Sequence, residues 1–309
     1  MGRIARAFIN HRPGDTVTII FLLFLLGLTA AFYHSLPKVS FLISLYSILL
    51  IVQIVLIQYK KKGKFLGFFY DLIFPTICIL TIFDSLEWLV HYVNPEDIDP
   101  MLIRLDYFIF GNHPTVMLEG ILHPLLTDIL QIAYSTYYFI PVSFGIILLV
   151  SGPKKDFDKS LFIILLCFYL SYLGYILMPA LGPRFYLDHL QTTGLQGLLV
   201  TEPLHDLLNR LEGIKRDAFP SGHTGIAVVV LYLAYHYKRN LFWIYLPIVS
   251  ALLFSTVYLR YHYVVDVIAG LGLTLLTILI GEWYYGWWLK NRERGSGDFR
   301  KTSLEGGGD

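Results

Sequence analysis

Two short segments of the chain hold the side chains that phosphoryl chemistry would need. The first is Pro220-Ser221-Gly222-His223, and the second, about forty residues later, holds His262 and Asp266. Residues four apart share one face of a helix, so the Asp266 carboxylate can keep one ring nitrogen of His262 protonated while the other nitrogen attacks. The pair therefore predicts transfer of a phosphoryl group through a histidine.

The first segment stands where an apolar run begins. Ser221, Gly222 and His223 would form the first turn of a helix, where backbone N–H groups lack partners and the positive end of the helix dipole could face a phosphate. The tetrapeptide alone also fits an ordinary turn and helix cap. Its coincidence with His262 and Asp266 favours the catalytic interpretation, because ionisable groups at membrane spans are costly and usually functional.

The composition places this chemistry in a membrane. The 309 residues are 55% hydrophobic and 15% charged, with a mean hydropathy of +0.59, which is too apolar for a soluble domain. The net charge of +1 gives no signal for nucleic-acid binding. Cys78 and Cys167 both lie in apolar segments and indicate neither a disulfide framework nor a cysteine metal site.

Apolar runs long enough to cross a bilayer recur along the chain. We predict an all-α fold, a polytopic transmembrane helical bundle of about eight spans, near residues 16–34, 39–59, 68–90, 128–150, 160–179, 222–237, 241–259 and 263–285. The expected organisation is two N-terminal transmembrane helices in residues 1–67, a six-helix core in 68–289 and a disordered cytoplasmic tail in 290–309.

Basic residues cluster in alternate connections between these spans. They are Arg3, Arg6, Arg12, Lys60, Lys61, Lys62, Lys64, Lys154, Lys155, Lys159, Lys238, Arg239, Lys290, Arg292, Arg294, Arg300 and Lys301. By the positive-inside rule, these connections and both chain termini are cytoplasmic. The segments with His223 and His262 are then expected on the extracytoplasmic face, where a lipid headgroup could reach them while its acyl chains stay in the bilayer.

The two segments resemble the second and third signature motifs of the type 2 phosphatidic acid phosphatase superfamily, which comprises membrane lipid phosphatases and phosphotransferases. The resemblance covers roughly residues 68–285. It implies that His262 is the nucleophile, that Asp266 orients it and that His223 protonates the leaving oxygen. It implies no metal and no cofactor, because fixed cations replace a divalent ion.

The resemblance also implies a set of phosphate-binding groups. Ser221 and the Gly222 amide would bind the phosphate, together with Arg184, which matches the arginine of the first motif. The expected partners are therefore a lipid phosphate or phospholipid substrate and the bilayer that holds it.

Two cations of the common members of this superfamily are replaced here, one by Leu177 and one by Thr256. Arg260 is placed to restore one of them, and Lys215 or Arg216 is placed to restore the other. The altered pattern resembles the branch that contains inositol phosphorylceramide synthases. That branch implies transfer of a headgroup to an alcohol or polyol acceptor.

Two further sets of residues are weaker candidates. Asp84 and Glu87 lie near the outer end of the third span and could bind an acceptor or headgroup hydroxyl, or equally form a structural ion pair. The following loop holds further histidines and aspartates, namely His91, His113, His123, Asp97 and Asp99. A metal site there is not favoured, because no spacing typical of zinc ligands occurs. Loop packing or substrate contact explains these residues better.

The sequence thus predicts a membrane enzyme that cleaves a lipid phosphate or phosphodiester through a phosphohistidine and passes the group to water or an alcohol. An inositol phosphorylceramide synthase-like transferase is the narrower alternative. A membrane transporter or a catalytically inactive scaffold are the alternatives of another class, although no pair of interrupted half-repeats indicates a transporter. The sequence does not predict the lipid, the headgroup or the oligomeric state.

Overall fold

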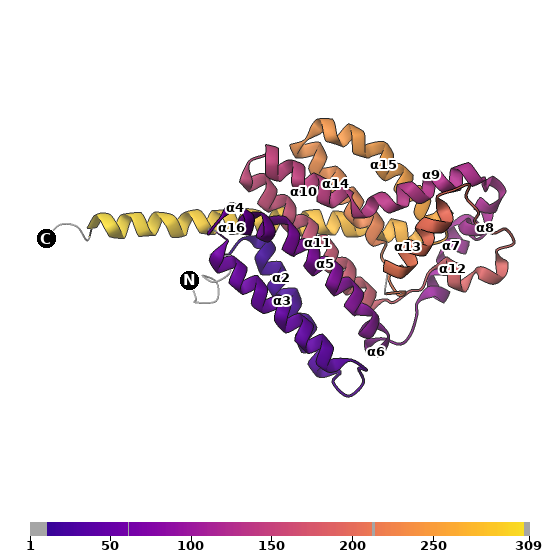
Figure 1. Cartoon of the computed structure of the whole chain (residues 1–309), viewed down its shortest axis with the longest axis horizontal. Coiled ribbons are helices and arrows are strands. Elements are labelled where there is room, and N and C mark those ends of the chain that lie inside the picture. The colour runs from indigo at the N-terminus through magenta and orange to yellow at the C-terminus, as the bar shows by residue number, and fades with distance from the viewer. Residues whose placement is uncertain (1–10, 61, 212–213, 306–309) are drawn as a thin grey trace.

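The computed structural model describes residues 11–60, 62–211 and 214–305. Within these ranges the regular secondary structure is helical and includes no strand, which confirms the predicted all-α fold. Figure 1 shows the helices gathered into one bundle, with α16 (Val264–Glu305) along its length and emerging at one end.

Six helices or continuous helical runs in the described residues are long and apolar enough to cross a membrane, or seven if one bent pair is a single span. The sequence predicted about eight. The six support an integral membrane protein. They are α2 (Pro13–Ala31), α3 (Val39–Tyr59), the run Lys64–Trp88, α11 (Lys154–Leu177), α15 (Arg239–Tyr258) and Val264–Glu293 within α16.

The other two predicted spans differ from the expectation for separate reasons. The span predicted near 128–150 is broken into α9 (Pro124–Ser135) and α10 (Ile140–Ser151), which are bent by 48°. Pro141, in the first turn of α10, has no N–H to donate back across the break. Helix α14 (Gly222–Tyr237) has the predicted bounds, but its 16 residues rise only about 24 Å, less than a hydrocarbon core of about 30 Å.

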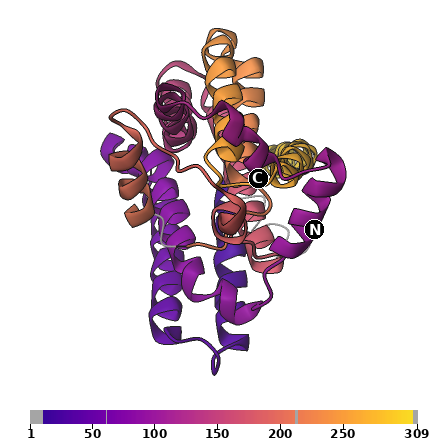
Figure 2. The same cartoon turned by 90° about the vertical axis from the view of Figure 1, so that its right-hand side faces the viewer.

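Helix α11 is the centre of the bundle. Its apolar residues occur on all of its faces, and 72% of its most apolar 18-residue stretch is buried. It packs against α2, α10, α14 and α16, and α14 also packs against α15 and α16. Figure 2 shows the antiparallel pair α2–α3 on one side of the molecule and α15 on the other.

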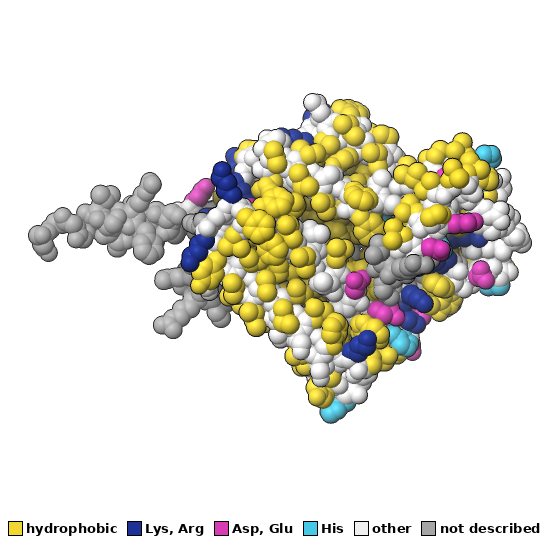
Figure 3. All heavy atoms as spheres, in the orientation of Figure 1, with side chains coloured by type: hydrophobic (Ala, Val, Ile, Leu, Met, Phe, Trp, Pro, Cys, Tyr) yellow, Lys and Arg dark blue, Asp and Glu magenta, His cyan; other side chains and the backbone are white. Residues whose placement is uncertain are grey.

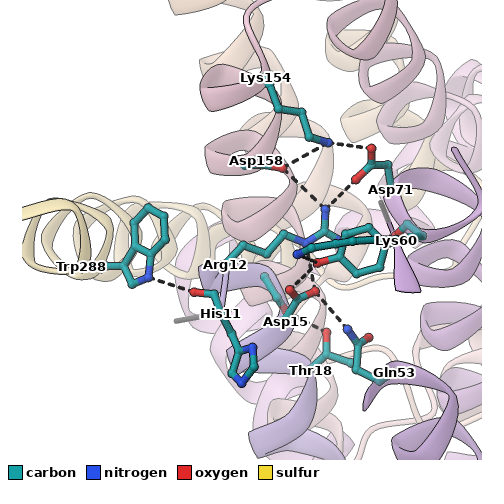
Figure 4. A network of polar contacts seen from close by, with 12 residues as sticks. His11, Arg12, Asp15, Thr18, Gln53, Lys60, Asp71, Lys154, Asp158 and Trp288 are labelled. Carbon is teal, nitrogen blue, oxygen red and sulfur yellow. Dashed lines mark hydrogen bonds and ion pairs between the residues drawn. The ribbon is translucent and has the colours of Figure 1, made fainter. Parts of the chain in front are cut away.

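Buried charges join the pair α2–α3 to the core at one end of the bundle (Figure 4). The Arg12 guanidinium donates through Nε to Asp15 and through Nη1 to Asp71, both at 2.9 Å, and lies 3.5 Å from Asp158. Lys154 approaches Asp71 to 2.6 Å and Asp158 to 3.4 Å. These five side chains, here called the Arg12 network, tie α2 and α11 to the run Lys64–Trp88.

Neutral groups complete the Arg12 network. Gln53 of α3 donates to the Asp15 carboxylate at 3.0 Å, and the Tyr70 hydroxyl donates to the same carboxylate. The indole N–H of Trp288 donates to the His11 carbonyl at 2.9 Å, which brings α16 to the same place (Figure 4). Five spanning segments are thereby fixed to one another at this end.

The opposite end is built from short helices that connect the spans (Figure 1). Figure 3 shows hydrophobic side chains over the middle of the molecule, with Lys and Arg gathered near the end from which α16 emerges and mixed charges with histidines at the other end. The remaining short elements are α4 (Lys64–Phe68), η1 (Phe69–Ile73), α5 (Phe74–Ser85), η2 (Leu86–Trp88), α6 (Val90–Val93), α7 (Asp99–Phe110), α8 (Pro114–Met117), η3 (Leu118–Ile121), η4 (Thr136–Tyr138), α12 (Pro183–Tyr186), η5 (Asp188–Leu190) and α13 (Thr201–Leu211).

The backbone of α16 remains helical to Glu305. The helix therefore continues through most of the segment 290–309 for which the sequence predicts a disordered tail. Lys290, Arg292 and Glu293 follow the apolar part of the helix and are good helix formers, so they extend it. Residues 306–309 of the predicted tail lie outside the described residues.

Candidate active site

The first signature segment caps a helix, as its residue types allow. Ser221 is the N-cap of α14, and its hydroxyl oxygen accepts from the Thr224 N–H at 3.3 Å. A Cβ at Gly222 would collide with the hydroxyl oxygen of buried Tyr175, so glycine suits this position. His223 follows in the first turn, with a side chain that is 7% exposed.

His262 lies in the turn between α15 and α16, where two groups approach its Nδ1 atom. The Ala218 carbonyl oxygen is 2.8 Å away and the Asp266 carboxylate 3.5 Å away. Because a carbonyl can only accept, Nδ1 carries the ring proton and Nε2 keeps a lone pair. Asp266 is on the predicted side of the ring, but its shortest contact is with the Tyr263 N–H at 2.8 Å. The contact with Ala218 was not predicted from the sequence.

The two histidines meet, as the sequence predicts. The Nε2 atom of His262 lies 3.3 Å from the Nδ1 atom of His223, and both rings are buried. Among the described residues, Nε2 of His223 and Oδ1 of Asp266 are buried atoms with no hydrogen-bond partner. Buried polar atoms without partners are uncommon and often mark a binding site.

Aromatic rings fix the orientation of His223. Tyr134 stacks on it with a ring separation of 4.5 Å, and Tyr137 approaches it to 4.1 Å. Tyr134 also stacks on Tyr261, the residue before His262, at 4.3 Å. The aromatic groups of η4 and α9 thus form a wall shared by both histidine segments.

Arg184 lies beside the same wall. Its guanidinium carbon is 4.9 Å from the centre of the Tyr261 ring, and its backbone N–H donates to the Arg260 carbonyl at 3.0 Å. Burial lowers the pKa of His262 to about 4; Asp217 and the Ala218 hydrogen bond oppose the shift and the charge of Arg184 adds to it. The imidazole is therefore neutral near pH 7, as a nucleophile must be.

The comparisons with known proteins bear on this arrangement. A family model described as the PAP2 superfamily matches residues 101–280, more than half of the chain. The chain belongs to the PAP2 superfamily. The match includes Arg184, His223 and His262.

A relative at lower similarity agrees with this assignment. A PA-phosphatase related-family protein of Dictyostelium discoideum is 24% identical over 188 residues, which are 54% of this chain. The chain spans about a third of that relative's length, because the matched part is 34% of it. No solved structure shows a significant match.

Arg260 occupies a different place from the other predicted phosphate-binding groups of this PAP2 protein. It has a φ of +66°, and its Nη2 atom donates to Glu119 at 2.9 Å and to the Thr193 carbonyl at 2.6 Å. Burial lowers the pKa of Arg260, whereas the Glu119 carboxylate acts to raise it. Its buried Nε atom has no hydrogen-bond partner among the described residues, so one donor is left for a ligand.

Lys215 and the two acidic candidates meet at the rim of the site. Lys215 is exposed, and its backbone N–H donates to the Glu87 carboxylate at 3.3 Å. Asp84 is exposed one turn before Glu87. Arg216 is committed to Asp97 through two hydrogen bonds of 2.7 and 3.2 Å, so Lys215 is the less engaged of the two cations.

A largely apolar cavity reaches the site. His223 and Asp217 contribute to its lining, and the rest of the wall comes mainly from α5, α10 and α11. Its lining extends to Leu72 and Phe157, which are next in sequence to Asp71 and Asp158 of the Arg12 network. The cavity therefore connects the buried end of the site with the interior of the bundle.

Two residues at the site escaped the sequence analysis. Asp217 acts on His262 electrostatically and lines the cavity. His205 of α13 lies 6.4 Å from the Tyr261 ring, and its pKa is lowered by burial and by Arg184. Asp217 could have been found by its position four residues before Ser221, whereas nothing in the sequence links His205 to the motifs.

The loop histidines are dispersed in the structure. His123 caps α9 by accepting from the Leu125 N–H at 3.3 Å, and His113 packs on Tyr107. In residues 11–60, 62–211 and 214–305, no group of three or more His, Cys, Asp or Glu side chains is placed to hold a metal ion.

Proposed function

We propose that this protein is a membrane lipid phosphatase or phosphotransferase that works through a phosphohistidine at His262. The observation that carries the proposal is the pairing of Nε2 of His262 with His223 while Nδ1 is held by the Ala218 carbonyl. This arrangement leaves one buried lone pair as the nucleophile and sets a second imidazole beside it.

The reaction follows from these positions. His223 takes up a proton when the phosphate anion binds beside it. The Nε2 lone pair of His262 then attacks phosphorus, the bond to the leaving oxygen breaks, and His223 supplies its proton to that oxygen. Because the leaving oxygen lies opposite the nucleophile, the phosphoryl group must enter between the rings and replace their 3.3 Å contact. Water or an alcohol then attacks phosphorus, His223 takes its proton, and His262 is released.

Charged groups around the rings support the same steps. Arg184, and Arg260 through its unused Nε, would neutralise the equatorial oxygens of the transferred group. The amides that begin α14 at Ser221 and Gly222 would add partial positive charge. Asp266 would stabilise the positive ring of the phosphohistidine.

The shape of the cavity supports a lipid substrate. An acyl chain could lie among apolar side chains of α5, α10 and α11 while its phosphate reaches His223. The rim beyond holds Asp84 and Glu87, which could bind an acceptor hydroxyl. A headgroup transferase similar to inositol phosphorylceramide synthases is therefore the second candidate, favoured by the contact of Glu87 with the Lys215 segment.

The decisive test is to trap the covalent intermediate. Purified protein is incubated briefly with a ³²P-labelled lipid phosphate and quenched in alkali, where phosphohistidine survives. We expect acid-labile label in the wild type and in the control His236→Ala, which alters an exposed histidine of the same helix. His262→Ala should carry no label. Turnover without any acid-labile label would refute the mechanism, and vanadate should inhibit turnover while EDTA should not.

We also propose that the site faces away from the cytoplasm and that both termini face the cytoplasm. The basic connections near the Arg12 network support this orientation. A cysteine at Gly194 should react with an impermeant thiol reagent in intact cells, and a cysteine at Gly63 should not. Both glycines are exposed, so the labelling reports sidedness, and the reverse pattern would overturn the orientation.

A further inference from the structure

Helix α7 carries two buried carboxylates that face the segments of the site. Asp99 has a relative exposure of 0% and Asp106 of 2%, although α7 is a short helix outside the candidate spans. The two residues are seven apart, so they lie on one face of the helix about 10 Å from each other. Neither residue belongs to a signature motif, and only Asp99 was considered from the sequence, as a metal ligand.

Asp99 binds the segment that leads to Arg184. Its Oδ2 atom accepts from the Leu181 N–H at 2.9 Å, and its Oδ1 atom accepts from the Gly182 N–H at 2.8 Å. The same Oδ1 accepts from the hydroxyl of Tyr263, the residue after His262, at 2.9 Å. One carboxylate therefore joins the Arg184 segment to the His262 turn.

The join is tight because of the backbone at Gly182. Its φ is +93°, and a Cβ there would lie 2.6 Å from the Tyr261 carbonyl oxygen. The two segments are thus in contact where Asp99 holds them, and a shift of one would displace the other.

Asp106 binds the other side of the same turn. Its two carboxylate oxygens accept from the Val264 N–H at 3.0 Å and the Val265 N–H at 2.9 Å. These amides open the first turn of α16, and Asp266 is the next residue. A side chain from another helix thus supplies the cap that fixes where α16 begins.

We propose that Asp99 and Asp106 are positioning residues for phosphoryl transfer, acting as a two-point clamp on α7 that fixes Arg184 relative to His262 and Asp266. This inference rests on the proposed function. Both aspartates act through backbone amides, and Asp99 also through the Tyr263 hydroxyl. Neither touches a reacting atom, so neither is a catalytic residue. A carboxylate suits the task because it has two acceptor oxygens and no donor.

The test uses the isosteric variants Asp99→Asn and Asp106→Asn, with Glu96→Gln as the matched control. Glu96 is an exposed carboxylate in the loop that precedes α7. In each variant the side-chain NH2 group of asparagine faces a backbone N–H, and two donors cannot bond. The clamp is therefore loosened without a change in side-chain volume. We expect kcat to fall about 100-fold, the loss that a displacement of about 1 Å causes, while KM changes little. The control should match the wild type.

Two further measurements separate positioning from a general loss of structure. If Asp99 acts through the Arg184 segment, Asp99→Asn should add almost nothing to the loss of activity caused by Arg184→Ala. Tyr263→Phe removes only one of the three hydrogen bonds to Asp99, should fold like the wild type, and should lower kcat severalfold. Additive losses in the double variant, or full activity in both Asn variants, would overturn the proposal.

Amide hydrogen exchange tests the clamp without reference to turnover. Asp99→Asn should speed exchange at Leu181 and Gly182, and Asp106→Asn should speed it at Val264 and Val265, each by at least tenfold and without change in α11. Unchanged exchange at these amides would overturn the clamp even if the enzyme is active. An inactive wild type with the expected exchange would instead count against the proposed function and leave the clamp standing.

Discussion

The Arg12 network and the histidine site are two buried clusters of ionisable groups, and they differ in how fully their atoms are paired. Every guanidinium nitrogen of Arg12 has an acceptor, from Asp15, Asp71 and the Tyr70 carbonyl. In the histidine site, Nε2 of His223, Oδ1 of Asp266 and Nε of Arg260 are buried without hydrogen-bond partners in the described part of the chain.

This difference in pairing indicates a structural role for the Arg12 network and a chemical role for the histidine site. In the Arg12 network, burial alone would lower the pKa of Arg12, but the surrounding carboxylates, Asp15 first, raise it above its ordinary value. Charge and countercharge are matched there: Oδ1 of Asp158 makes no hydrogen bond, but it forms ion pairs with Arg12 and Lys154. Burial without matching at the histidines is unfavourable in the folded protein unless a ligand completes it, which agrees with a phosphate site.

Among the variants that test this comparison, His223→Ala should have the largest effect on activity. Losing the general acid should slow transfer from a lipid alcohol by about 10² to 10⁴-fold. A substrate with a good leaving group, such as an aryl phosphate, should lose far less, because it needs no proton on departure. The measurement is the ratio of kcat/KM for the two substrates in variant and wild type. Equal losses for both would contradict the role of His223 as general acid.

Arg12→Met, in contrast, should lower folding stability and leave activity unchanged. Removing the guanidinium leaves Asp15 buried without its charged partner, whereas Asp71 keeps Lys154, and should cost about 3–5 kcal/mol of folding stability. Turnover per folded molecule should stay at the wild-type value, because the network lies at the other end of the cavity. Unfolding in a graded detergent or denaturant series measures the loss.

Arg104→Met is the matched control for this variant, since Arg104 is exposed and donates to the Pro100 carbonyl of its own helix. Adding Asp15→Leu to Arg12→Met should recover part of the stability, because it removes one stranded charge. A fall in turnover per folded molecule with Arg12→Met would mean that the Arg12 network communicates with the site.

The pairing of the two histidines could be predicted from the sequence because it depends on residue type and order. Neither the Ala218 carbonyl nor the direction of Arg260 could be predicted in this way. Any residue can supply a carbonyl, so its position depends on the folded loop alone. Arg260 turns toward Glu119 because its φ is positive, and spacing along a chain does not indicate where a residue leaves the helical region.

Other features could not be predicted from the sequence because they depend on contacts between distant parts of the chain. Asp99 and Asp106 look like solvated charges on a short helix, and their burial follows only from the packing of α7 against the Leu181–Gly182 segment and the start of α16. The break between α9 and α10 contains a visible proline, Pro141, but a proline indicates a kink without giving its angle. The fold class needed only hydropathy and was therefore predictable.

A smaller effect is expected from pH. Folded His262 binds a proton near pH 4, whereas the unfolded imidazole binds one near 6.5, so the folded state holds fewer protons between these values. Stability should therefore decrease as the pH falls from about 6.5 to 4. The His262 ring stays mostly neutral down to about pH 5, so its titration should leave kcat/KM nearly flat to that pH and lower it tenfold per unit only below about pH 4.

A soluble short-chain substrate with a phosphodiester group suits this measurement, because its own charge does not change in the window. The control is the fraction of folded protein at each pH, by tryptophan fluorescence. An acid limb centred near pH 6.5, with the protein fully folded, would show that the His262 ring is more hydrated than its burial indicates.

The smallest effect is expected at the rim, where Glu87→Gln tests whether the histidine site has a second, acceptor pocket. Glu87 accepts from the Lys215 N–H and lies away from the paired rings, so its loss should leave attack by water nearly unchanged. If an alcohol binds there, product formed on an added polyol should fall severalfold more than phosphate released to water, because only acceptor binding is damaged. Asp84→Asn should behave alike, and Glu96→Gln should change neither product. Equal falls in both activities, or no stimulation by any polyol or lipid alcohol, would favour a simple phosphatase and assign Glu87 to the support of the Lys215 segment.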